Sequence, residues 1–229
     1  VVLSARREDR LRALAADLER DFDIETRVVA VDLAERSGQA ALLEGVADLD
    51  IGLLVNNAGL GYAGRFDLLD GEQLRRLVMV NCEAPLVLTH SLVQGMRERG
   101  CGAVLFTGSV AGRIPLPLHA VYSATKAFDL FLGEALWGEL RASNIDVVVL
   151  EPGSTETEFQ EVAGEIAHPG QNADDVARTG LAALGQQPSV IPGWFNWLRA
   201  NVASRFLTRA MSAHAAYAVL AKQTPEDLL

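Results

Sequence analysis

The sequence alternates short apolar runs rich in Val, Ile and Leu with longer runs in which apolar residues recur at helical spacing. Ile145–Leu150 is an example of the first kind, and Glu8–Arg20, with Leu11, Leu14 and Leu18 on one face, is an example of the second. Strands that are separated by helices cannot pair as hairpins, so successive strands run parallel. The pattern therefore predicts an α/β fold, with a doubly wound parallel sheet and helices on both of its faces.

The predicted elements follow one another without a linker or an internal repeat, which favours a single domain over residues 1–229. The predicted strands are Val1–Leu3, Thr26–Val31, Ile51–Asn56, Ala103–Thr107, Ile145–Leu150 and Ser189–Ile191. The predicted helices are Glu8–Arg20, Ala34–Ala47, Glu72–Arg99, Leu118–Arg141 and Asp174–Leu184, and Pro85 is expected to kink the third. In such folds ligands bind beyond the carboxyl ends of the strands, so the residues that follow each strand are the candidates for a site.

Tyr122 and Lys126 lie four residues apart in the predicted helix Leu118–Arg141, so their side chains share one face. A neighbouring ammonium stabilises the phenolate and is expected to lower the pKa of the phenol from its usual value of about 10. Such a pair donates a proton near neutral pH. Pairs with this spacing are common on helices, so the motifs around the pair decide whether it has a chemical role.

Those motifs are Asn57-Ala58-Gly59 after an apolar strand, Asn81 within a helical run, Ser109 at the end of another strand, and Pro152-Gly153-x-x-x-Thr157. Ser109 precedes Tyr122 by thirteen residues. In this order and spacing the chain resembles the short-chain dehydrogenase/reductase family. The resemblance implies a Rossmann-like fold and an oxidoreductase that transfers a hydride between a nicotinamide cofactor and a carbonyl or secondary alcohol.

The resemblance also implies a catalytic set of Asn81, Ser109, Tyr122 and Lys126. Tyr122 is the expected acid/base, and Lys126 is expected to lower its pKa and to hold the nicotinamide ribose. Ser109 is expected to donate a hydrogen bond to the substrate oxygen. Asn81 resembles the family residue that places a water behind Lys126 in a proton relay. Taken singly, Ser109 is also compatible with ending a strand, and Asn81 with satisfying buried backbone.

The turn after the first strand, Ser4-Ala5-Arg6-Arg7, contains no acidic residue. An acidic residue there usually binds the free adenosine ribose, whereas arginine favours a 2′-phosphate. We therefore expect NADP(H) rather than NAD(H), with Arg6 as the phosphate partner and Ser4 as a hydrogen-bond donor. The alternative is that both arginines only flank a helix start, where the helix dipole disfavours cations.

Further cofactor contacts are implied by the resemblance alone. Asp32 and Leu33 resemble the adenine contact, and Asn57, Ala58 and Gly59 resemble the wall beside the ribose. Pro152, Gly153 and Thr157 resemble the site of the nicotinamide carboxamide, and Thr155 is the alternative to Thr157 in that role. Tyr122 and Lys126 are the implied contacts of the nicotinamide ribose.

Two segments are candidates for substrate recognition. Residues 151–170 are the least periodic stretch and are expected to form a loop over the substrate. Residues 194–222 are expected to be helical and are rich in aromatic and basic residues, and no acidic residue lies between Asp175 and Glu226. Such a segment either packs over the substrate pocket or a partner subunit, which we favour, or contacts an anionic membrane surface or an acyl carrier. Both interpretations favour a lipophilic substrate.

Composition restricts the partners. The net charge of −10 argues against nucleic acid. No apolar run approaches the ~18 residues of a membrane span. The two cysteines and four histidines are scattered, which predicts no metal site and is typical of a cytoplasmic protein. The resemblance implies a homodimer or homotetramer built on the helices Glu72–Arg99 and Leu118–Arg141.

The resemblance covers Val1 to about Pro192, but it lacks the family's opening strand and Gly-rich loop. The chain starts with Val at what resembles the second strand, so we expect a fragment that lacks the first βα unit. Such a chain should bind cofactor poorly and expose unpaired strand edges at Val1–Leu3 and Ile51–Asn56. A catalytically silent scaffold is the alternative function. The missing loop favours it if the natural protein begins at Val1, whereas the four intact catalytic positions argue against it.

Overall fold

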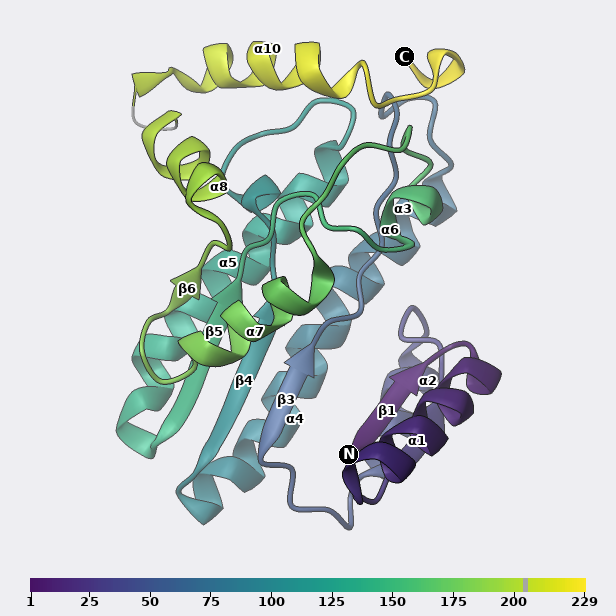
Figure 1. The fold of residues 1–229 in the computed structure, drawn as a ribbon, viewed down its shortest axis with the longest axis vertical. Coiled ribbons are helices and arrows are strands. Elements are labelled where there is room, and N and C mark those ends of the chain that lie inside the picture. The colour runs from purple at the N-terminus through teal and green to yellow at the C-terminus, as the bar shows by residue number, and fades with distance from the viewer. Residues whose placement is uncertain (204–205) are drawn as a thin grey trace.

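The computed structural model describes residues 1–203 and 206–229, with strands in the middle and helices on both sides (Figure 1). Every strand pair is parallel. The strands are β1 (Val2–Ala5), β2 (Arg27–Ala30), β3 (Leu53–Asn56), β4 (Gly102–Thr107), β5 (Ile145–Leu150) and β6 (Ser189–Val190). Each overlaps a predicted strand, so the α/β class and the parallel Rossmann-like arrangement are confirmed.

The strands form two separate sheets, because β1 pairs only with β2 and the other four strands follow the order β3-β4-β5-β6. Among the described residues no strand lies between β1 and β3, whose facing edges are both unpaired (Figure 1). Leu53 and Val55 on β3 are 41% and 46% exposed. The two unpaired edges that the sequence predicts are therefore confirmed.

The helices occupy the predicted positions, with ends that differ by a few residues. They are α1 (Glu8–Phe22), α2 (Arg36–Gly45), α3 (Gly71–Val78), α4 (Ala84–Arg99), α5 (Ala120–Leu140), α6 (Phe159–Val162), α7 (Ala173–Ala183), α8 (Trp194–Leu198) and α10 (Arg209–Leu220). The sequence explains several of these boundaries. For example, α1 has Glu8 and Asp9 in its first turn and Arg20 in its last turn, which complements the helix dipole.

The single helix expected over Glu72–Arg99 is divided in two. A π-helical segment, Met79–Glu83, separates α3 from α4, and the backbone N–H of Ala84 donates to the carbonyl of Met79 five residues earlier. Pro85 in the first turn of α4 has no N–H to donate to the carbonyl four residues before it, so the regular ladder is interrupted here. Short π-helical segments are frequent at functional sites, and this one carries the buried Asn81.

The core lies on both faces of β4 and β5. Phe106, Val147 and Val149 are fully buried on the face that α4 and α5 cover, whereas Leu105 and Val148 belong to a second cluster beneath α7. Each such side chain stabilises the fold by roughly 1.5–3 kcal/mol through burial. The packing fixes the sheet and the flanking helices as one scaffold for the loops at the strand ends.

The close packing of α5 against the sheet depends on Gly133. A Cβ at this position would lie 2.2 Å from Cγ2 of Val149 on β5. Only glycine allows the helix to approach the strand this closely without displacement. The distance matters for the site, because α5 carries both Tyr122 and Lys126.

The C-terminal segment that the sequence predicts as helical consists of α8, a π-helical segment Arg199–Ala203 and α10. Figure 1 shows α8 and α10 beyond the carboxyl ends of the strands. Arg205, one of the basic residues of this segment, lies outside the described residues. None of the helices in the described part of the chain is long and apolar enough to span a bilayer.

Candidate active site

The N-terminal half of α5 brings Tyr122 and Lys126 to the carboxyl edge of the sheet. Lys126 is 5% exposed, and its Nζ donates to the carbonyl of Thr107 at 2.6 Å and to Oδ2 of Asp129 at 3.1 Å. The same Nζ lies 6.0 Å from the centroid of the Tyr122 ring. The two side chains therefore share a face, as their spacing predicts.

Asp129 belongs to the site although sequence reasoning missed it. It is 4% exposed and pairs with Lys126, while its other oxygen, Oδ1, is buried without a partner among the described residues. Its negative charge opposes the effect of Lys126 and contributes to raising the pKa of Tyr122. The i,i+3 spacing from Lys126 was the signal that would have identified it.

The pKa of Tyr122 differs from the expectation. Burial raises it, and the lowering by Lys126 and by the Ser109 hydroxyl does not compensate. The ring of Phe159 covers the phenol, with 5.5 Å between the two ring centroids. The predicted lowering of the pKa is thus wrong for this closed arrangement, because loss of hydration disfavours the phenolate more than one nearby cation stabilises it.

Ser109 links the ends of β4 and β5. Its Oγ accepts a hydrogen bond from the backbone N–H of Ala111 at 3.1 Å and donates to the carbonyl of Pro152 at 3.3 Å. The hydroxyl also acts on the Tyr122 phenol, whose pKa it lowers. Ser109 therefore ends a strand, which was the alternative to its catalytic interpretation, and its hydroxyl also faces Tyr122.

Asn81 uses its side chain to hold the loop that follows β3. Its Nδ2 donates to the carbonyl of Leu60 at 2.9 Å and to Oγ1 of Thr125 at 3.0 Å, and its Oδ1 accepts from the N–H of Leu60 at 2.8 Å. A Cβ on Gly59 would lie 3.7 Å from both Asn81 Oδ1 and Lys126 Nζ. The residue thus satisfies buried backbone and lies next to Lys126.

The remaining residues of the loop after β3 line the same edge of the sheet. Oδ1 of Asn57 accepts a hydrogen bond from the Thr107 hydroxyl at 3.2 Å, which joins this loop to the end of β4. Ala58 and Gly59 follow, and a Cβ on Gly59 would meet Nζ of Lys126 at 3.7 Å. The contiguity of Asn57, Gly59 and Lys126 agrees with the wall that the sequence predicts beside a ribose.

At the end of β1, the side chains of two predicted cofactor ligands make no hydrogen bond to any described residue, although the charge of Arg6 contributes to lowering the pKa of Asp32. Arg6 is exposed and makes no hydrogen bond or ion pair to any described residue, and Oγ of Ser4 is buried without a partner. Arg7 instead pairs with Glu158 at 2.9 Å. Of the two arginines in this turn, Arg6 is therefore the one whose guanidinium is available to an anion.

Asp32 and Leu33, at the end of β2, are already bonded within the protein. Oδ2 of Asp32 accepts from Arg76 at 2.6 Å and Oδ1 accepts from the N–H of Ala34, while the carbonyl of Leu33 accepts from Gln39. Burial opposes ionisation of Asp32, but these hydrogen bonds hold the pKa of its carboxyl below the usual value. The pair therefore presents a fixed edge beyond β2.

Residues 151–170 form a loop that crosses the site from β5 towards α1. Besides the contact of Phe159 with Tyr122, Glu158 pairs with Arg7 and with Arg10, and the carbonyl of Ala163 accepts from the N–H of Ala63 at 2.9 Å. Sequence reasoning identified the loop but neither Phe159 nor Glu158, because nothing in the local pattern shows what a loop residue will contact. In this position the loop covers part of the half-buried Tyr122 side chain.

The start of this loop holds the residues expected at a carboxamide. Oγ1 of Thr155 donates to the carbonyl of Gly153 at 3.2 Å, while Oγ1 of Thr157 accepts from the N–H of Phe159 at 3.2 Å. A Cβ on Gly153 would lie 2.6 Å from Nδ2 of Asn196 on α8. Pro152 and Gly153 are thereby held between Ser109 and α8, and neither threonine points to the role more strongly than the other.

A polar cluster lies beside Tyr122. His119 is 5% exposed, its Nδ1 is 3.8 Å from Glu165, and the opposite side of that carboxylate is 3.8 Å from His168. Burial, together with the charge of His168, lowers the pKa of His119 to about 4, whereas burial raises the pKa of Glu165. Among the described residues no group of histidines, cysteines and acids is suited to hold a metal ion.

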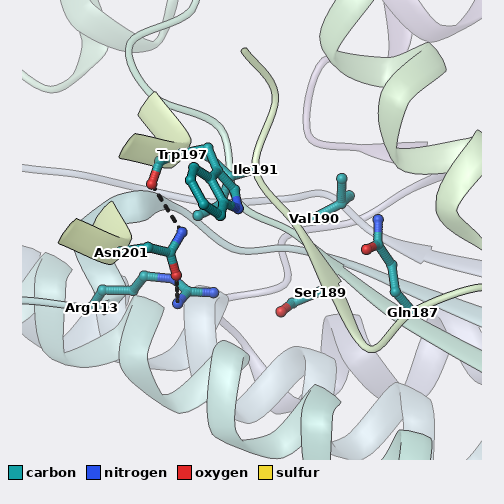
Figure 2. A pocket seen from close by; sticks show the side chains of 7 residues that line it. All are labelled: Arg113, Gln187, Ser189, Val190, Ile191, Trp197 and Asn201. Carbon is teal, nitrogen blue, oxygen red and sulfur yellow. Dashed lines mark hydrogen bonds between the residues drawn. The ribbon is translucent and has the colours of Figure 1, made fainter. Parts of the chain in front are cut away.

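A cavity of about 250 Å³ lies next to β6 and α8 (Figure 2). Its lining includes Arg113, Trp197 and Asn201, and the side chain of Asn201 accepts from Arg113 at 3.4 Å. Arg113 also forms a bidentate ion pair with Glu151, which is fully buried. None of the four predicted catalytic residues lines this cavity, so it is separate from the candidate active site.

Comparison with known proteins places this geometry in a family. The sequence profile of the short chain dehydrogenases matches residues 1–166. The very-long-chain 3-oxoacyl-CoA reductase of Homo sapiens is 33% identical over 166 residues, which are 71% of this chain and 53% of that protein. The 7beta-hydroxysteroid dehydrogenase of Clostridium sardiniense is 30% identical over 201 residues, which are 86% of this chain and 77% of that protein.

A solved structure, the short-chain dehydrogenase from Sphingobium yanoikuyae in complex with NADPH, superposes with a TM-score of 0.81. It is 31% identical, and the alignment covers 89% of this chain and 82% of that one. The chain spans about half the length of the 3-oxoacyl-CoA reductases that it matches. The profile match over most of the chain, the parallel sheet and the assembled Ser109, Tyr122 and Lys126 agree, and the chain therefore belongs to the short-chain dehydrogenase family.

Proposed function

We propose that this protein is an NADP(H)-dependent oxidoreductase that interconverts a carbonyl and a secondary alcohol. The observation that carries the proposal is the convergence of the Ser109 hydroxyl and the Lys126 ammonium on the Tyr122 phenol. A proton donor, a hydrogen-bond donor and a cation around one point are what a developing alkoxide requires. Asn81 and Asp129 hold this arrangement from two sides.

The residues present fit the two ends of the cofactor. At the adenosine end, Arg6 has an available guanidinium and Ser4 a buried hydroxyl without a partner, which would bind a 2′-phosphate, and Asp32 with Leu33 would border the adenine. At the other end, Asn57, Ala58 and Gly59 would border the ribose, and Pro152, Gly153 and Thr157 or Thr155 the carboxamide. The family's Gly-rich phosphate loop does not occur in residues 1–229, so these ends do not by themselves give a complete site.

When bound, the cofactor supplies or accepts the hydride. The chain's own residues handle the substrate oxygen and one proton. Ser109 donates a hydrogen bond to that oxygen, and Tyr122 transfers its phenolic proton to it as negative charge develops. Lys126 stabilises the resulting phenolate. Asn81 holds the loop that follows β3 beside Lys126 through its hydrogen bonds to the backbone of Leu60. The loop 151–170 excludes water through Phe159.

Two features support a lipophilic substrate. Phe159 presents an aromatic ring above Tyr122, and α8, which is bonded to the loop region through Gln171, carries exposed aromatic side chains. Similarity to a 3-oxoacyl-CoA reductase and to a hydroxysteroid dehydrogenase agrees with bulky apolar substrates. We propose that the chain acts on a substrate of this kind.

The test has a binding arm and a turnover arm. Titration calorimetry should give tighter binding of NADPH than of NADH, and Arg6→Ala should remove that difference. NADPH oxidation is then followed with long-chain 3-oxoacyl thioesters and ketosteroids. Tyr122→Phe should lower kcat by roughly 10²–10⁴, the usual contribution of a positioned acid/base. The matched control Tyr217→Phe, which removes an exposed hydroxyl from α10, should leave kcat unchanged. Equal activity of Tyr122→Phe and wild type would reject the proposal.

A catalytically silent scaffold that retains the fold is the second candidate. The two candidates differ in the binding arm, since a scaffold has no need of NADPH.

The oligomeric state is a separate proposal. Phe131 on α5 and Leu86 on α4 are 72% and 46% exposed, which supports a homodimer or homotetramer that buries these two helices. A cytoplasmic location is part of the same proposal. Sedimentation of wild type against Phe131→Ser tests it.

A further inference from the structure

We propose that α8 docks onto the surface of an anionic phospholipid bilayer, with its aromatic side chains in the headgroup region. The helix is amphipathic with its apolar side turned to solvent. Trp194, Phe195, Trp197 and Leu198 are 77%, 55%, 54% and 41% exposed. Phe206, further along the chain, is 81% exposed.

The orientation of α8 follows from its one polar residue. With about 100° between successive residues, the four apolar side chains fall on one half of the helix and Asn196 on the other. Nδ2 of Asn196 donates to Oε1 of Gln171 at 2.9 Å and to the carbonyl of Pro192 at 3.3 Å. The polar side is therefore bonded to the protein and holds the apolar side outward, which is the reverse of a helix that packs on a core.

The expectation that the segment packs over the substrate pocket or a partner subunit stays a prediction, and the bilayer is the alternative that we develop here. The three aromatic side chains of α8 are each more than half exposed, although Trp197 also lines the cavity beside Arg113. Trp194 and Phe195 contact each other edge to face, with 5.9 Å between ring centroids, and form a small apolar surface. An exposed cluster of large apolar residues is typical of a binding surface.

Charge decides which partner fits that surface. The residues between Asp175 and Glu226 include five basic and no acidic ones, so they contribute five positive charges to a chain of net charge −10. The rest of the chain therefore carries a net charge of −15. An anionic bilayer attracts the first region and repels the second, which orients the molecule with α8 towards the lipid.

Arg199 lies where phosphate headgroups would be. The guanidinium carbon of Arg199 is 5.8 Å from the centroid of the Phe195 ring, beside the apolar half of α8. Arg209, at the start of α10, is exposed. Aromatic side chains with flanking arginines are the usual composition of interfacial helices. An acidic carrier protein would use the charges but would leave two tryptophans and a phenylalanine in water, so the bilayer is the better match.

The test is co-sedimentation with vesicles of phosphatidylcholine alone and of phosphatidylcholine with phosphatidylserine, at low and high salt. We expect binding to the vesicles that contain phosphatidylserine, weakened by salt, with a blue shift of tryptophan fluorescence. The double variant Trp194→Ser, Phe195→Ser should bind these vesicles at least about tenfold more weakly. In this variant two aromatic side chains are no longer transferred from water into the headgroup region. The control Phe22→Ser removes a phenylalanine that is 68% exposed on α1 and should bind like wild type.

Three outcomes would overturn the proposal. The first is no binding to either vesicle at low salt. The second is vesicle binding that survives the aromatic substitutions but not Arg199→Glu, which would show that charge alone holds the protein on the lipid and that the aromatic side chains of α8 do not enter the headgroup region. The third is an oligomer in sedimentation velocity that the double variant abolishes, which would show that a second copy covers α8. Quenching of wild-type tryptophan by brominated lipid tests insertion without any substitution.

Discussion

His119 should make this protein sensitive to mild acid. The side chain is buried, and its pKa in the folded state is about 4, whereas an unfolded histidine titrates near 6.5. Because the folded-state pKa is the lower one, the unfolded chain binds a proton that the folded chain cannot accept. Stability that is fully present above about pH 6.5 is therefore lost as the pH falls towards 4.

The size of this loss follows from the two pKa values. At pH 5 the linkage amounts to about 2 kcal/mol, and well below pH 4 it approaches about 3 kcal/mol. For a chain of this size, 2 kcal/mol corresponds to a Tm lower by about 4–8 °C. Glu165, which faces His119, has a raised pKa and acts in the opposite direction, so the effect must be measured as a difference between variants.

The assay is urea unfolding of wild type and His119→Gln at several pH values between 7.5 and 5. Glutamine keeps a polar side chain but does not titrate, so the stability difference between the two proteins should change by about 2 kcal/mol over this range. The control His214→Gln removes an exposed histidine and should follow wild type. Parallel pH curves for wild type and His119→Gln would refute the reasoning, because they would show that His119 does not resist protonation in the folded state.

Three further predictions concern buried groups. Glu151→Leu should lower the free energy of unfolding by about 3–5 kcal/mol in urea titrations, and Glu151→Leu with Arg113→Leu should recover part of this, because a lone buried charge costs more than an apolar pair. A double variant as unstable as the sum of the singles would contradict it. Asp129→Asn should shift the basic limb of the pH–rate profile to lower pH, because the pKa of Tyr122 falls when the nearby anion is removed, whereas an unmoved limb would count against it. Phe159→Ala should also lower the pKa of Tyr122, because the phenol loses the ring that covers it. The pKa is measured by tyrosinate absorbance at 295 nm, after subtraction of the same titration of Tyr122→Phe. An unchanged midpoint would mean that Phe159 does not desolvate the phenol.

Local pattern was sufficient for much of this protein. Helical periodicity and β-branched runs predicted the parallel strands and most helices, since these depend on spacing within a few residues. The four-residue separation of Tyr122 and Lys126 put them on one face of α5 for the same reason. The single helix that the sequence predicts over Glu72–Arg99 is divided in the structure. The composition favours one helix, but the carbonyl that Pro85 leaves without a donor interrupts it with a π-helical segment.

What the sequence by itself determined is therefore the class of fold, the family and the shared helix face of Tyr122 and Lys126, because each rests on short-range spacing. The tertiary structure alone decided how those groups behave. Phe159 contacts Tyr122 from a loop 37 residues further along the chain, and burial of the phenol raises its pKa, against the expected direction. Asn196 fixes which side of α8 meets solvent. Desolvation and exposure are sums over neighbours distant in sequence, and no local pattern contains them.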